Sequence, residues 1–389
     1  MPNVTATALP MDRLISRRAK SIDASGIRKV FDLAAKLKDP INLSIGQPDF
    51  PVPERMKRAA VDAILENRNG YTVTQGIPPL LDAIWTRLRD EVQWEGPNAD
   101  RGAIVTSGTS GGLLLAFMCL LDAGDEAIVP DPYFVMYPQL GTMTGGTIVP
   151  CDTYPDFRMT AERVEKLITP RTKAVLVNSP SNPCGVVLRE RELADLVDLC
   201  RSKGVLLISD EIYDEFVFAD AKEDGRFPTP ARYSQDLLLI RGFGKSYGCT
   251  GWRLGYAAGP QELIQAMARL QQYTFVCAPS MAQWGVVPAF EIDMSDEVER
   301  YRGRRDMVLE AFRGVAHVPQ PGGAFYCFVE VPPKLGLTAT EFVERSIDRS
   351  VLVIPGKVFS RRDTHFRLSY ATNEEKLRAG LGILRGLMS

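Results

Sequence analysis

Short apolar segments that alternate with helical segments constrain the fold of this chain more than any other feature. These apolar segments are AIVTS, AIVPD, TIVPC, KAVLVNSP, VLLISDEIY and LLLIRGF. Apolar runs without a polar alternation are typical of strands that are buried on both faces, and strands that alternate with helices form parallel sheets covered by helices. The pattern therefore predicts an α/β fold in which a mostly parallel sheet is sandwiched by helices.

The pattern changes after about residue 290, and a chain of 389 residues is long enough for two domains. A charged helical segment, DEVERYRGRRDMVLEAFRG, is followed by the strand-like segments GGAFYCFVEV, VLVIPG and THFRLSYA. We expect an N-terminal arm and part of a small domain at 1–48, a large domain at 49–290, and a small α+β domain at 291–389. Within the first part, SGIRKVFDLAAKLKD is expected to form a helix.

The composition argues against several classes of protein. The 46 basic and 48 acidic residues give a formal net charge of −2, which does not favour nucleic acid or an anionic membrane as a partner. No apolar run has the length of a bilayer-spanning helix, and the N-terminus lacks the apolar core of a secretory signal. The seven cysteines are scattered, which fits reduced thiols. We therefore expect a cytoplasmic protein.

The histidines limit the possible catalytic chemistry. Only His317 and His365 are present, so neither a histidine-rich zinc site nor a Ser-His-Asp triad with a GxSxG motif is expected. We expect no metal, and we expect lysine, tyrosine or carboxylate groups to carry any proton transfer.

The segment 237–256, LLLIRGFGKSYGCTGWRLGY, places a lysine in a glycine-rich loop directly after an apolar strand. Loops at this end of a parallel strand usually contact ligands. Burial of Lys245 would lower its pKa and leave a neutral amine that attacks a carbonyl, while Arg253 offers a permanent charge to a phosphate. An aldehyde and a phosphate together suggest pyridoxal phosphate. The alternative is a surface lysine beside a structural arginine.

A second loop, VTSGTSGG, ends a predicted strand and begins an apolar helix. The backbone N–H groups of Gly108, Thr109 and Ser110 could hold a phosphate, with help from the helix dipole. A plain helix cap is the alternative interpretation of this loop.

Four further polar residues follow or lie within apolar strands. Asn182 can donate to a phenolate or carboxylate oxygen, and Tyr213 can hydrogen-bond a ring oxygen. Asp210 would be a costly buried carboxylate unless it met a cation such as a protonated pyridine nitrogen. Arg367, in HFRLSYA, requires a carboxylate partner. The alternatives are a turn asparagine, a residue at the edge of the core, a helix cap and an internal salt bridge.

The ordered segments YTVTQGIPPLLDAI, DPYFVMY, NSPSNPCGVV, SDEIYDEF, GKSYGCTGWRLGY and FRLSYA resemble the class I/II aminotransferases, which are fold-type I pyridoxal-phosphate enzymes. The resemblance covers nearly the whole chain. SGIRKVFDLAAKL and INLSIGQPDFPVP look most like the branch of prokaryotic aspartate, aromatic and kynurenine/2-aminoadipate transaminases. It implies an aspartate aminotransferase-like fold, with pyridoxal phosphate bound by the domain at 49–290.

The activity that this resemblance implies is that of an aminotransferase (EC 2.6.1.-). The enzyme would move the amino group of an L-amino acid to a 2-oxo acid, expected to be 2-oxoglutarate, by a ping-pong mechanism. Lys245 would carry the aldimine (Schiff base) and shuttle the proton, and Asp210 would pair with the pyridinium. Asn182 and Tyr213 would hold the ring oxygen. Phe134 would stack on the ring, with the residue before it, Tyr133, as the near alternative.

The remaining roles are implied in the same way. Thr109, Ser110 and Arg253, together with the glycine loop, would hold the phosphate. Tyr71 would reach the cofactor phosphate of a neighbouring subunit, which requires a homodimer. Arg367 would bind the α-carboxylate of the substrate, assisted by Asn182 and by the backbone of Gly46.

The chain departs from the family pattern before the lysine. Gly242 and Gly244 stand where many relatives have serine, which leaves open whether a hydroxyl that binds the phosphate is missing. An acidic substrate would need another cation, for which Arg28 is a candidate, although a charge on the surface of a helix is the simpler interpretation. Tyr273, Phe275 and Trp284 could instead line an aromatic pocket, or form core. We expect broad use of aromatic or acidic amino acids.

Other reactions fit the same residues. A C–S or β-lyase, a racemase or a cyclase of the same fold would use the same bond between lysine and cofactor. A non-catalytic pyridoxal-phosphate-binding regulator usually has an attached DNA-binding segment, and no basic domain precedes residue 40. An apo structural relative would not need Lys245, Asp210 and Arg253.

Overall fold

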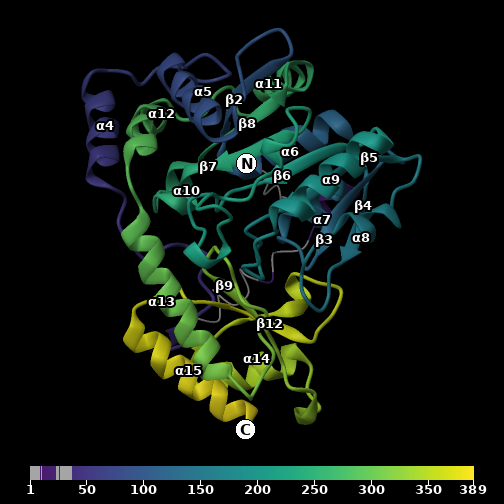
Figure 1. Ribbon diagram of the computed structural model, residues 1–389, viewed down its shortest axis with the longest axis vertical. Helices are drawn as coiled ribbons and strands as arrows, with labels where there is room; N and C mark the ends of the chain where they lie inside the picture. Colours follow the sequence, from purple (N-terminus) through teal and green to yellow (C-terminus); the bar gives the residue numbers. More distant parts are fainter. Residues whose placement is uncertain (1–8, 10, 23–25, 27–36) are drawn as a thin grey trace, which may run out of the picture.

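The computed structural model describes residue 9 and residues 11–22, 26 and 37–389 (Figure 1). In this part of the chain, a central sheet has the strand order β2-β8-β7-β6-β5-β3-β4. Its strands are β2 (Arg101–Ser107), β3 (Glu126–Asp131), β4 (Thr147–Asp152), β5 (Thr172–Asn178), β6 (Leu206–Asp210), β7 (Leu238–Gly242) and β8 (Leu254–Pro260). Among them, β8 alone runs opposite to the other six strands. The mostly parallel α/β fold predicted from the apolar segments is confirmed.

Both faces of the central sheet are buried, because successive side chains of a strand point to opposite faces. In β2, Ile104 packs into one hydrophobic core, and Ala103 and Val105 pack into the other. The first core is covered by α6 (Gly108–Leu120), α7 (Met136–Thr144) and α11 (Gln261–Thr274). The second contains buried residues of α5 (Pro78–Val92) and α9 (Glu190–Lys203). This double burial explains why the strands have no polar alternation.

A smaller sheet occupies the lower half of Figure 1, with the antiparallel order β11-β12-β9. The helices α13, α14 and α15 lie around it, and β1 pairs in parallel with β10 nearby. The bounds are β1 (Ile41–Asn42), β9 (Tyr326–Glu330), β10 (Val351–Leu352), β11 (Ile354–Pro355), β12 (His365–Ser369), α13 (Ser295–Phe312), α14 (Ala339–Asp348) and α15 (Glu374–Met388). The domain boundaries after residues 48 and 290 stay a prediction.

The other helices are short or lie at the edge of the central sheet. They are α1 (Met11–Leu14), α2 (Arg17–Lys20), α4 (Glu54–Leu65), α8 (Ala161–Glu165), α10 (Phe243–Ser246) and α12 (Ser280–Val286). Short 3₁₀ turns cover 219–221, 230–232, 250–252, 287–291, 333–335 and 356–358. The helix expected in SGIRKVFDLAAKLKD falls almost entirely outside the described residues.

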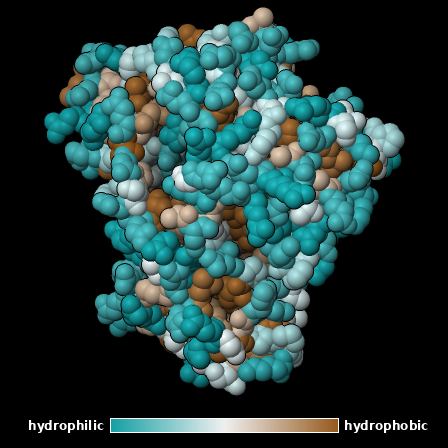
Figure 2. Space-filling model, viewed as in Figure 1, coloured by the Kyte–Doolittle hydropathy of each residue, from teal (hydrophilic) through white to brown (hydrophobic). Residues whose placement is uncertain are grey.

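The surface in Figure 2 is largely hydrophilic. Apolar side chains show mainly around the middle of the molecule and at the upper left, where Figure 1 places α4. None of the helices in the described residues combines the length and the apolar character that crossing a bilayer requires.

Candidate active site

One cavity of about 650 Å³ lies where β2, β5, β6 and β7 end and where β8 begins. The carboxyl ends of parallel strands open onto one edge of a sheet, and β8 contributes its first residues because it runs the other way. The predicted residues that line this cavity are Gly46, Gly108, Thr109, Ser110, Phe134, Asn182, Asp210, Tyr213, Lys245, Arg253 and Arg367. Of the predicted site residues, Tyr71 alone lies outside it.

Lys245 lies in α10, the single helical turn that follows β7 directly. Its Nζ donates a hydrogen bond to the carbonyl oxygen of Gly46. Burial, together with the positive charges of Arg367 and Arg253, lowers the pKa of Lys245 to about 8. A useful fraction of this amine is therefore uncharged near neutral pH, and the uncharged amine is the form that attacks a carbonyl carbon.

Asp210 is the last residue of β6, and its side chain is buried. The hydroxyl of Tyr137 donates to its Oδ2 at 2.7 Å, and the backbone N–H of Ile212 donates to Oδ1 at 3.3 Å. No side-chain cation of the described residues forms an ion pair with it, and burial raises the pKa of Asp210 to about 6 despite the Tyr137 hydrogen bond. A buried carboxylate without a cation is a site that favours a positively charged ligand atom.

Arg367 lies in the middle of β12, and its guanidinium is a buried cation, just as the side chain of Asp210 is a buried carboxylate. Its Nη1 donates to Oδ1 of Asn182 at 3.0 Å, and its Nη2 donates to the carbonyl oxygen of Ser44 at 2.8 Å. The guanidinium also lies 4.5 Å from the ring centroid of Tyr326 and 4.6 Å from that of Phe359. Its Nε has no partner in the described residues, and burial lowers the pKa of Arg367. This guanidinium is therefore held in place by neutral groups and is available to an incoming carboxylate.

The glycine loop and Arg253 form the opposite corner of the cavity. Gly108 begins α6 with a φ of 67°, and Arg253 has a φ of 55° just before β8. The positive φ of Gly108 favours glycine at this position, and the absence of a Cβ leaves room for Nη2 of Arg253, which would lie 2.8 Å from one. Thr109 and Ser110 follow in the first turn of α6, whose N–H groups and dipole favour an anion.

Aromatic residues form two further walls. Phe134 lines the cavity, whereas Tyr133 does not; its backbone N–H instead bonds the carbonyl oxygen of Phe359. The hydroxyl of Tyr213 is 3.3 Å from that of Tyr326, and burial raises the pKa of Tyr213 well above its ordinary value. Tyr213 is therefore a neutral hydrogen-bond donor at neutral pH.

Sequence reasoning missed several cavity residues, of which Tyr137, Tyr326 and Asn178 form hydrogen bonds with predicted site residues. Tyr137 is the last residue of DPYFVMY, and its hydroxyl donates a hydrogen bond to the carboxylate of Asp210. Tyr326, on β9, contacts both Tyr213 and the arginine of β12. Asn178 accepts a hydrogen bond from the backbone N–H of Asn182 at 2.9 Å. The aromatic cluster in DPYFVMY was a signal for Tyr137, but the pattern does not say which of its aromatic residues turns inward.

Several candidates lie elsewhere. The side chain of Tyr71 is 89% exposed, and Tyr273 is equally exposed. Phe275 and Trp284 do not line the cavity, and Trp284 packs under the guanidinium of Arg68 at 4.0 Å. Tyr273, Phe275 and Trp284 therefore form no wall of this cavity, and an aromatic pocket built from them stays a prediction. Arg28 lies outside the described residues.

The two glycines that precede the lysine differ in their surroundings. A Cβ at Gly242 would lie 2.8 Å from Cδ1 of Ile212 and 2.9 Å from Cγ2 of Thr109, so a larger residue would displace a predicted phosphate ligand. A Cβ at Gly244 would lie 3.3 Å from Cα of Thr250, a tight but less severe contact. Packing therefore explains the glycine at 242 better than the one at 244.

The chemistry of these groups fits pyridoxal phosphate. The buried carboxylate of Asp210 lacks the cation that a protonated pyridine nitrogen would supply. Arg253 and the start of α6 suit a phosphate, and Lys245 suits an aldehyde. Arg367 remains for the carboxylate of a substrate. Each charge therefore matches one part of the expected cofactor or of an amino acid.

Comparisons with known proteins agree with this chemistry. The family model "Aminotransferase class I and II" matches residues 38–384. A probable aspartate aminotransferase of Methanocaldococcus jannaschii is 35% identical over 382 residues, which cover 96% of this chain and 99% of that protein. An aspartate/prephenate aminotransferase of Thermus thermophilus is 36% identical over 383 residues, covering 95% and 97%. The solved structure of Thermus thermophilus aspartate aminotransferase with maleate has a TM-score of 0.88 at 35% identity, covering 96% and 99%.

Proposed function

This chain belongs to the class I and II aminotransferases, and on that premise we propose that it uses pyridoxal phosphate to move the amino group of an L-amino acid to 2-oxoglutarate in two alternating half-reactions. One observation carries the proposal. The same cavity is lined by a buried amine of lowered pKa and, as far as the described residues go, by a buried carboxylate without a cation and a buried guanidinium without an anion. A pyridoxal-phosphate-dependent aminotransferase would use each of these three groups.

The cavity residues divide between the parts of the cofactor. We assign Asp210 to the ring nitrogen, Asn182 and Tyr213 to the ring oxygen, and Phe134 to the face of the ring. The phosphate is assigned to Gly108, Thr109, Ser110 and Arg253. When bound, pyridoxal phosphate supplies an aldehyde carbon and an electron-withdrawing ring.

The chain supplies orientation and proton transfer. Arg367 binds the α-carboxylate of the substrate, and the amide of Asn182, 3.0 Å from Nη1 of Arg367, keeps the guanidinium in place. Lys245 attaches the cofactor through Nζ and, once released, accepts the proton from Cα of the substrate. Its lowered pKa keeps the amine near the pH at which it can both accept and return a proton.

The donor amino acids are proposed to be acidic or aromatic. One relative is named for aspartate and another for aspartate and prephenate. Besides its charged residues, the cavity is lined by apolar residues such as Ile45, Pro48 and Leu254. A panel of L-amino acids with 2-oxoglutarate should give the highest kcat/KM with aspartate, glutamate, phenylalanine or tyrosine. Highest turnover with small aliphatic or basic donors would contradict this choice.

The attachment to Lys245 is tested by borohydride reduction of the cofactor-loaded protein. The peptide that contains Lys245 should gain the mass of the reduced cofactor, and Lys245→Ala should lose the adduct and at least about 10⁴-fold of turnover. Lys203→Ala, at a surface lysine paired with Glu165, is the matched control and should keep both. An unmodified Lys245 peptide, or an active Lys245→Ala variant, would reject the assignment.

The two half-reactions separate a transaminase from other enzymes of this fold. With amino donor and no acceptor, the loaded enzyme should release one equivalent of 2-oxo acid per site and then stop. Continuous product release under these conditions would indicate a lyase, and loss of optical activity of the donor would indicate a racemase.

We also propose a homodimer in which Tyr71 reaches the cofactor phosphate of the partner. Exposed apolar side chains cluster on α4, on the loop after it and at the end of α11: Val61, Ile64, Leu65, Tyr71, Val73, Tyr273, Phe275 and Val276. The two regions adjoin, because Nε2 of Gln271 donates to the carbonyl oxygen of Thr74 at 2.7 Å. Exposed apolar clusters of this kind mark interaction surfaces.

Sedimentation should therefore give a dimer that Val73→Glu weakens, while Tyr233→Ser, at an exposed aromatic residue in another region, leaves it intact. Tyr71→Phe should keep the dimer and lower cofactor affinity by about tenfold, the value of one charge-assisted hydrogen bond. A monomeric parent protein with full cofactor affinity would overturn this part of the proposal. The cytoplasmic location expected from the sequence stays a prediction.

A further inference from the structure

The backbone pairing between β6 and β7 stops before the end of β7. Strand β6 ends at Asp210, and β7 leads directly into the turn that carries Lys245. Their pairing stops at Asp210–Ile240, and the last backbone bond runs from the N–H of Glu211 to the carbonyl oxygen of Ile240 at 2.8 Å. Between β7 and β8 the pairing continues to Gly242–Gly255.

Side chains take over where this pairing ends. Arg241 follows Ile240 on β7, and its Nε donates to Oε2 of Glu211 at 2.9 Å. Both side chains are 1% exposed. The other oxygen of Glu211 accepts hydrogen bonds from Ser209 at 2.8 Å and Thr229 at 2.6 Å. A buried ion pair, in which both oxygens of Glu211 accept hydrogen bonds, thus joins the two strands just beyond their last backbone bond.

A second connection reaches the turn that carries the lysine. Ser246, the residue after Lys245, is fully buried, and its Oγ donates to Oδ1 of Asp214 at 3.3 Å. Oδ2 of Asp214 lies 3.6 Å from Nε of Arg241. Arg241 therefore contacts the segment after β6 both directly and through the carboxylate that holds Ser246.

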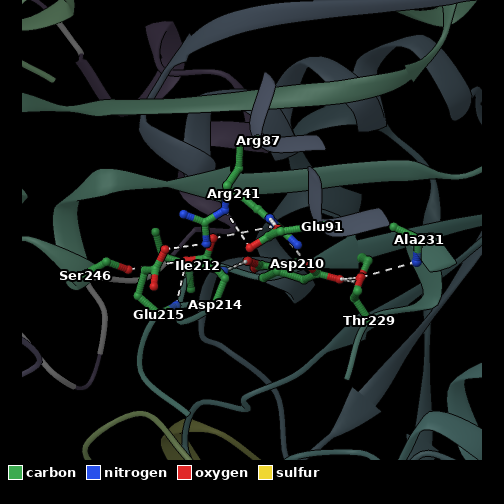
Figure 3. A network of polar contacts seen from close by, with 12 residues as sticks. Arg87, Glu91, Asp210, Ile212, Asp214, Glu215, Thr229, Ala231, Arg241 and Ser246 are labelled. Carbon is green, nitrogen blue, oxygen red and sulfur yellow. Dashed lines mark hydrogen bonds and ion pairs between the residues drawn. The ribbon is translucent and has the colours of Figure 1, made fainter. Parts of the chain in front are cut away.

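The surrounding charges complete what we call the Arg241 network (Figure 3). Arg241 and Arg87, on β7 and α5, are bridged by the carboxylate of Glu91, and Arg87 also pairs with Glu215. The members of the network are Arg87, Glu91, Glu211, Asp214, Glu215, Arg241 and Ser246. None of them lines the cavity. The network lies behind the reacting groups and cannot touch substrate or cofactor.

Stability alone is a weak reason for such a network. Replacing a buried ion pair by apolar residues is often neutral or stabilising, whereas removing one partner is costly. The Glu211–Arg241 pair lies at the ends of the two strands, which must be held at a fixed separation. Since a displacement of about 1 Å can cost about a hundredfold in rate, fixing this separation is a sufficient function.

We propose that Arg241, acting through Glu211 and Asp214, is a positioning residue that fixes the Lys245 amine relative to the Asp210 carboxylate. The inference rests on the proposed function, because it assigns these two groups to opposite ends of one cofactor. Without the network, the turn 243–246 loosens and Nζ of Lys245 gains contact with water.

The proposal is tested in the cofactor-free protein by whether the pH midpoint of Lys245 rises or falls in each variant. The pH midpoint for modification of Lys245 by a small amine reagent, followed by peptide mass spectrometry, should rise by about one pH unit in both Arg241→Met and Glu211→Gln. Long-range electrostatics alone would raise it when the cation is removed and lower it when the anion is removed. Opposite shifts, or no shift in either variant, would overturn the proposal.

The loaded enzyme supplies the second readout. Arg241→Met should lower kcat about tenfold or more while the KM for the amino donor stays within about twofold, and Arg241→Lys should recover part of the loss. Arg305→Met is the matched control, because Arg305 is an equally buried arginine that pairs with Asp220 on another element. It should lose stability and keep both kcat and the midpoint of Lys245. Equal behaviour of the two Met variants would reduce Arg241 to a structural role.

Ser246→Ala covers the case in which Arg241→Met does not fold. It removes only the 3.3 Å hydrogen bond and should shift the Lys245 midpoint upward by a smaller amount. Ser346→Ala, at a buried serine of α14, should not shift it. An unshifted midpoint in Ser246→Ala, together with a fully active Glu211→Gln, would reject the proposal. Failure of the parent protein to bind pyridoxal phosphate would reject the proposed function instead, and the titration of the cofactor-free protein would still decide this inference.

Discussion

The two sides of the β6–β7 pair treat buried charge in opposite ways. On the cavity side, within the described residues, neither Asp210 nor Arg367 forms an ion pair with an oppositely charged side chain. On the other side, Arg241 is bonded to two carboxylates in the Arg241 network. Unpaired buried charges destabilise a fold and are ready for a ligand, whereas paired ones hold the chain in place. The unpaired charges are the groups proposed to bind cofactor and substrate, and the paired charges are the groups proposed to position the site.

The largest effect should come from removing the unpaired carboxylate. Asp210→Asn keeps the shape of the side chain but cannot stabilise a protonated ring, so kcat should fall by about a hundredfold or more. Glu126→Gln, at a buried carboxylate that pairs with Arg171 near the start of β3, should leave kcat unchanged. Steady-state assays of both variants test this prediction, and a normal kcat in Asp210→Asn would reject the assignment of Asp210 to the ring nitrogen.

The same substitution has a consequence for stability without cofactor. The pKa of Asp210 is raised from 3.8 to about 6, so the unfolded chain releases this proton at lower pH than the folded protein does. The free energy of unfolding therefore falls as pH rises from about 4 to about 6. The full decrease, about 3 kcal/mol, persists above that range. Urea unfolding should find Asp210→Asn more stable than the parent at pH 7 and equal to it near pH 4, whereas Glu126→Gln should not gain stability, because hydrogen bonds from Thr169 and Arg171 lower the pKa of Glu126.

A smaller effect is expected at the unpaired cation. Arg367→Met removes the charge and keeps most of the side-chain volume, so the KM for amino acids and for 2-oxo acids should rise about a hundredfold through loss of charge-assisted hydrogen bonds. Stability without cofactor should hold or increase, because burial lowers the pKa of this guanidinium and so disfavours its charge. In Arg305→Met, which breaks a paired arginine, the opposite pattern is expected: lower stability and unchanged KM. Equal KM values in both variants would place the substrate carboxylate elsewhere.

The smallest effect should follow Tyr137→Phe, which removes one hydrogen bond from Asp210. The loss of a donor to the ionised carboxylate raises the pKa of Asp210 further, so kcat should fall by up to about tenfold. Tyr370→Phe removes a buried hydroxyl that bonds the carbonyl oxygen of Ala324, outside the cavity, and should not change kcat. If the two variants had equal kcat, Tyr137 would be a packing residue.

Six of the seven strands of the central sheet were predictable from the sequence because they are short apolar segments, whereas β8 was not among the segments recognised. The convergence of Asn182, Asp210 and Lys245 followed from the same pattern, since parallel strands end at one edge. Tyr137 was missed because it lies one turn beyond Phe134 in the same aromatic segment, and the sequence does not say which ring faces Asp210. Tyr326 was missed because it comes from a different sheet.

The Arg241 network was missed for another reason. Arg241 interrupts an apolar strand, as Arg367 does, but its partners lie far away in the sequence or on the next strand. Glu91 is 150 positions before it, on α5. Sequence patterns show that a charge is buried, but only the packed structure shows whether that charge is neutralised.

The pairing of β1 with β10 cannot form until both of these segments have been synthesised. Residues 41–42 leave the ribosome early, yet their partners are residues 351–352. The strands of the central sheet, in contrast, all lie between residues 101 and 260 and can assemble while the rest is still being translated. Ser44 and Gly46, which touch the arginine and the lysine of the cavity, follow β1 directly. A truncated chain that lacks residues 340–389 therefore loses both the strand that pairs with β1 and Arg367, so the cavity loses one wall even where the central sheet is complete.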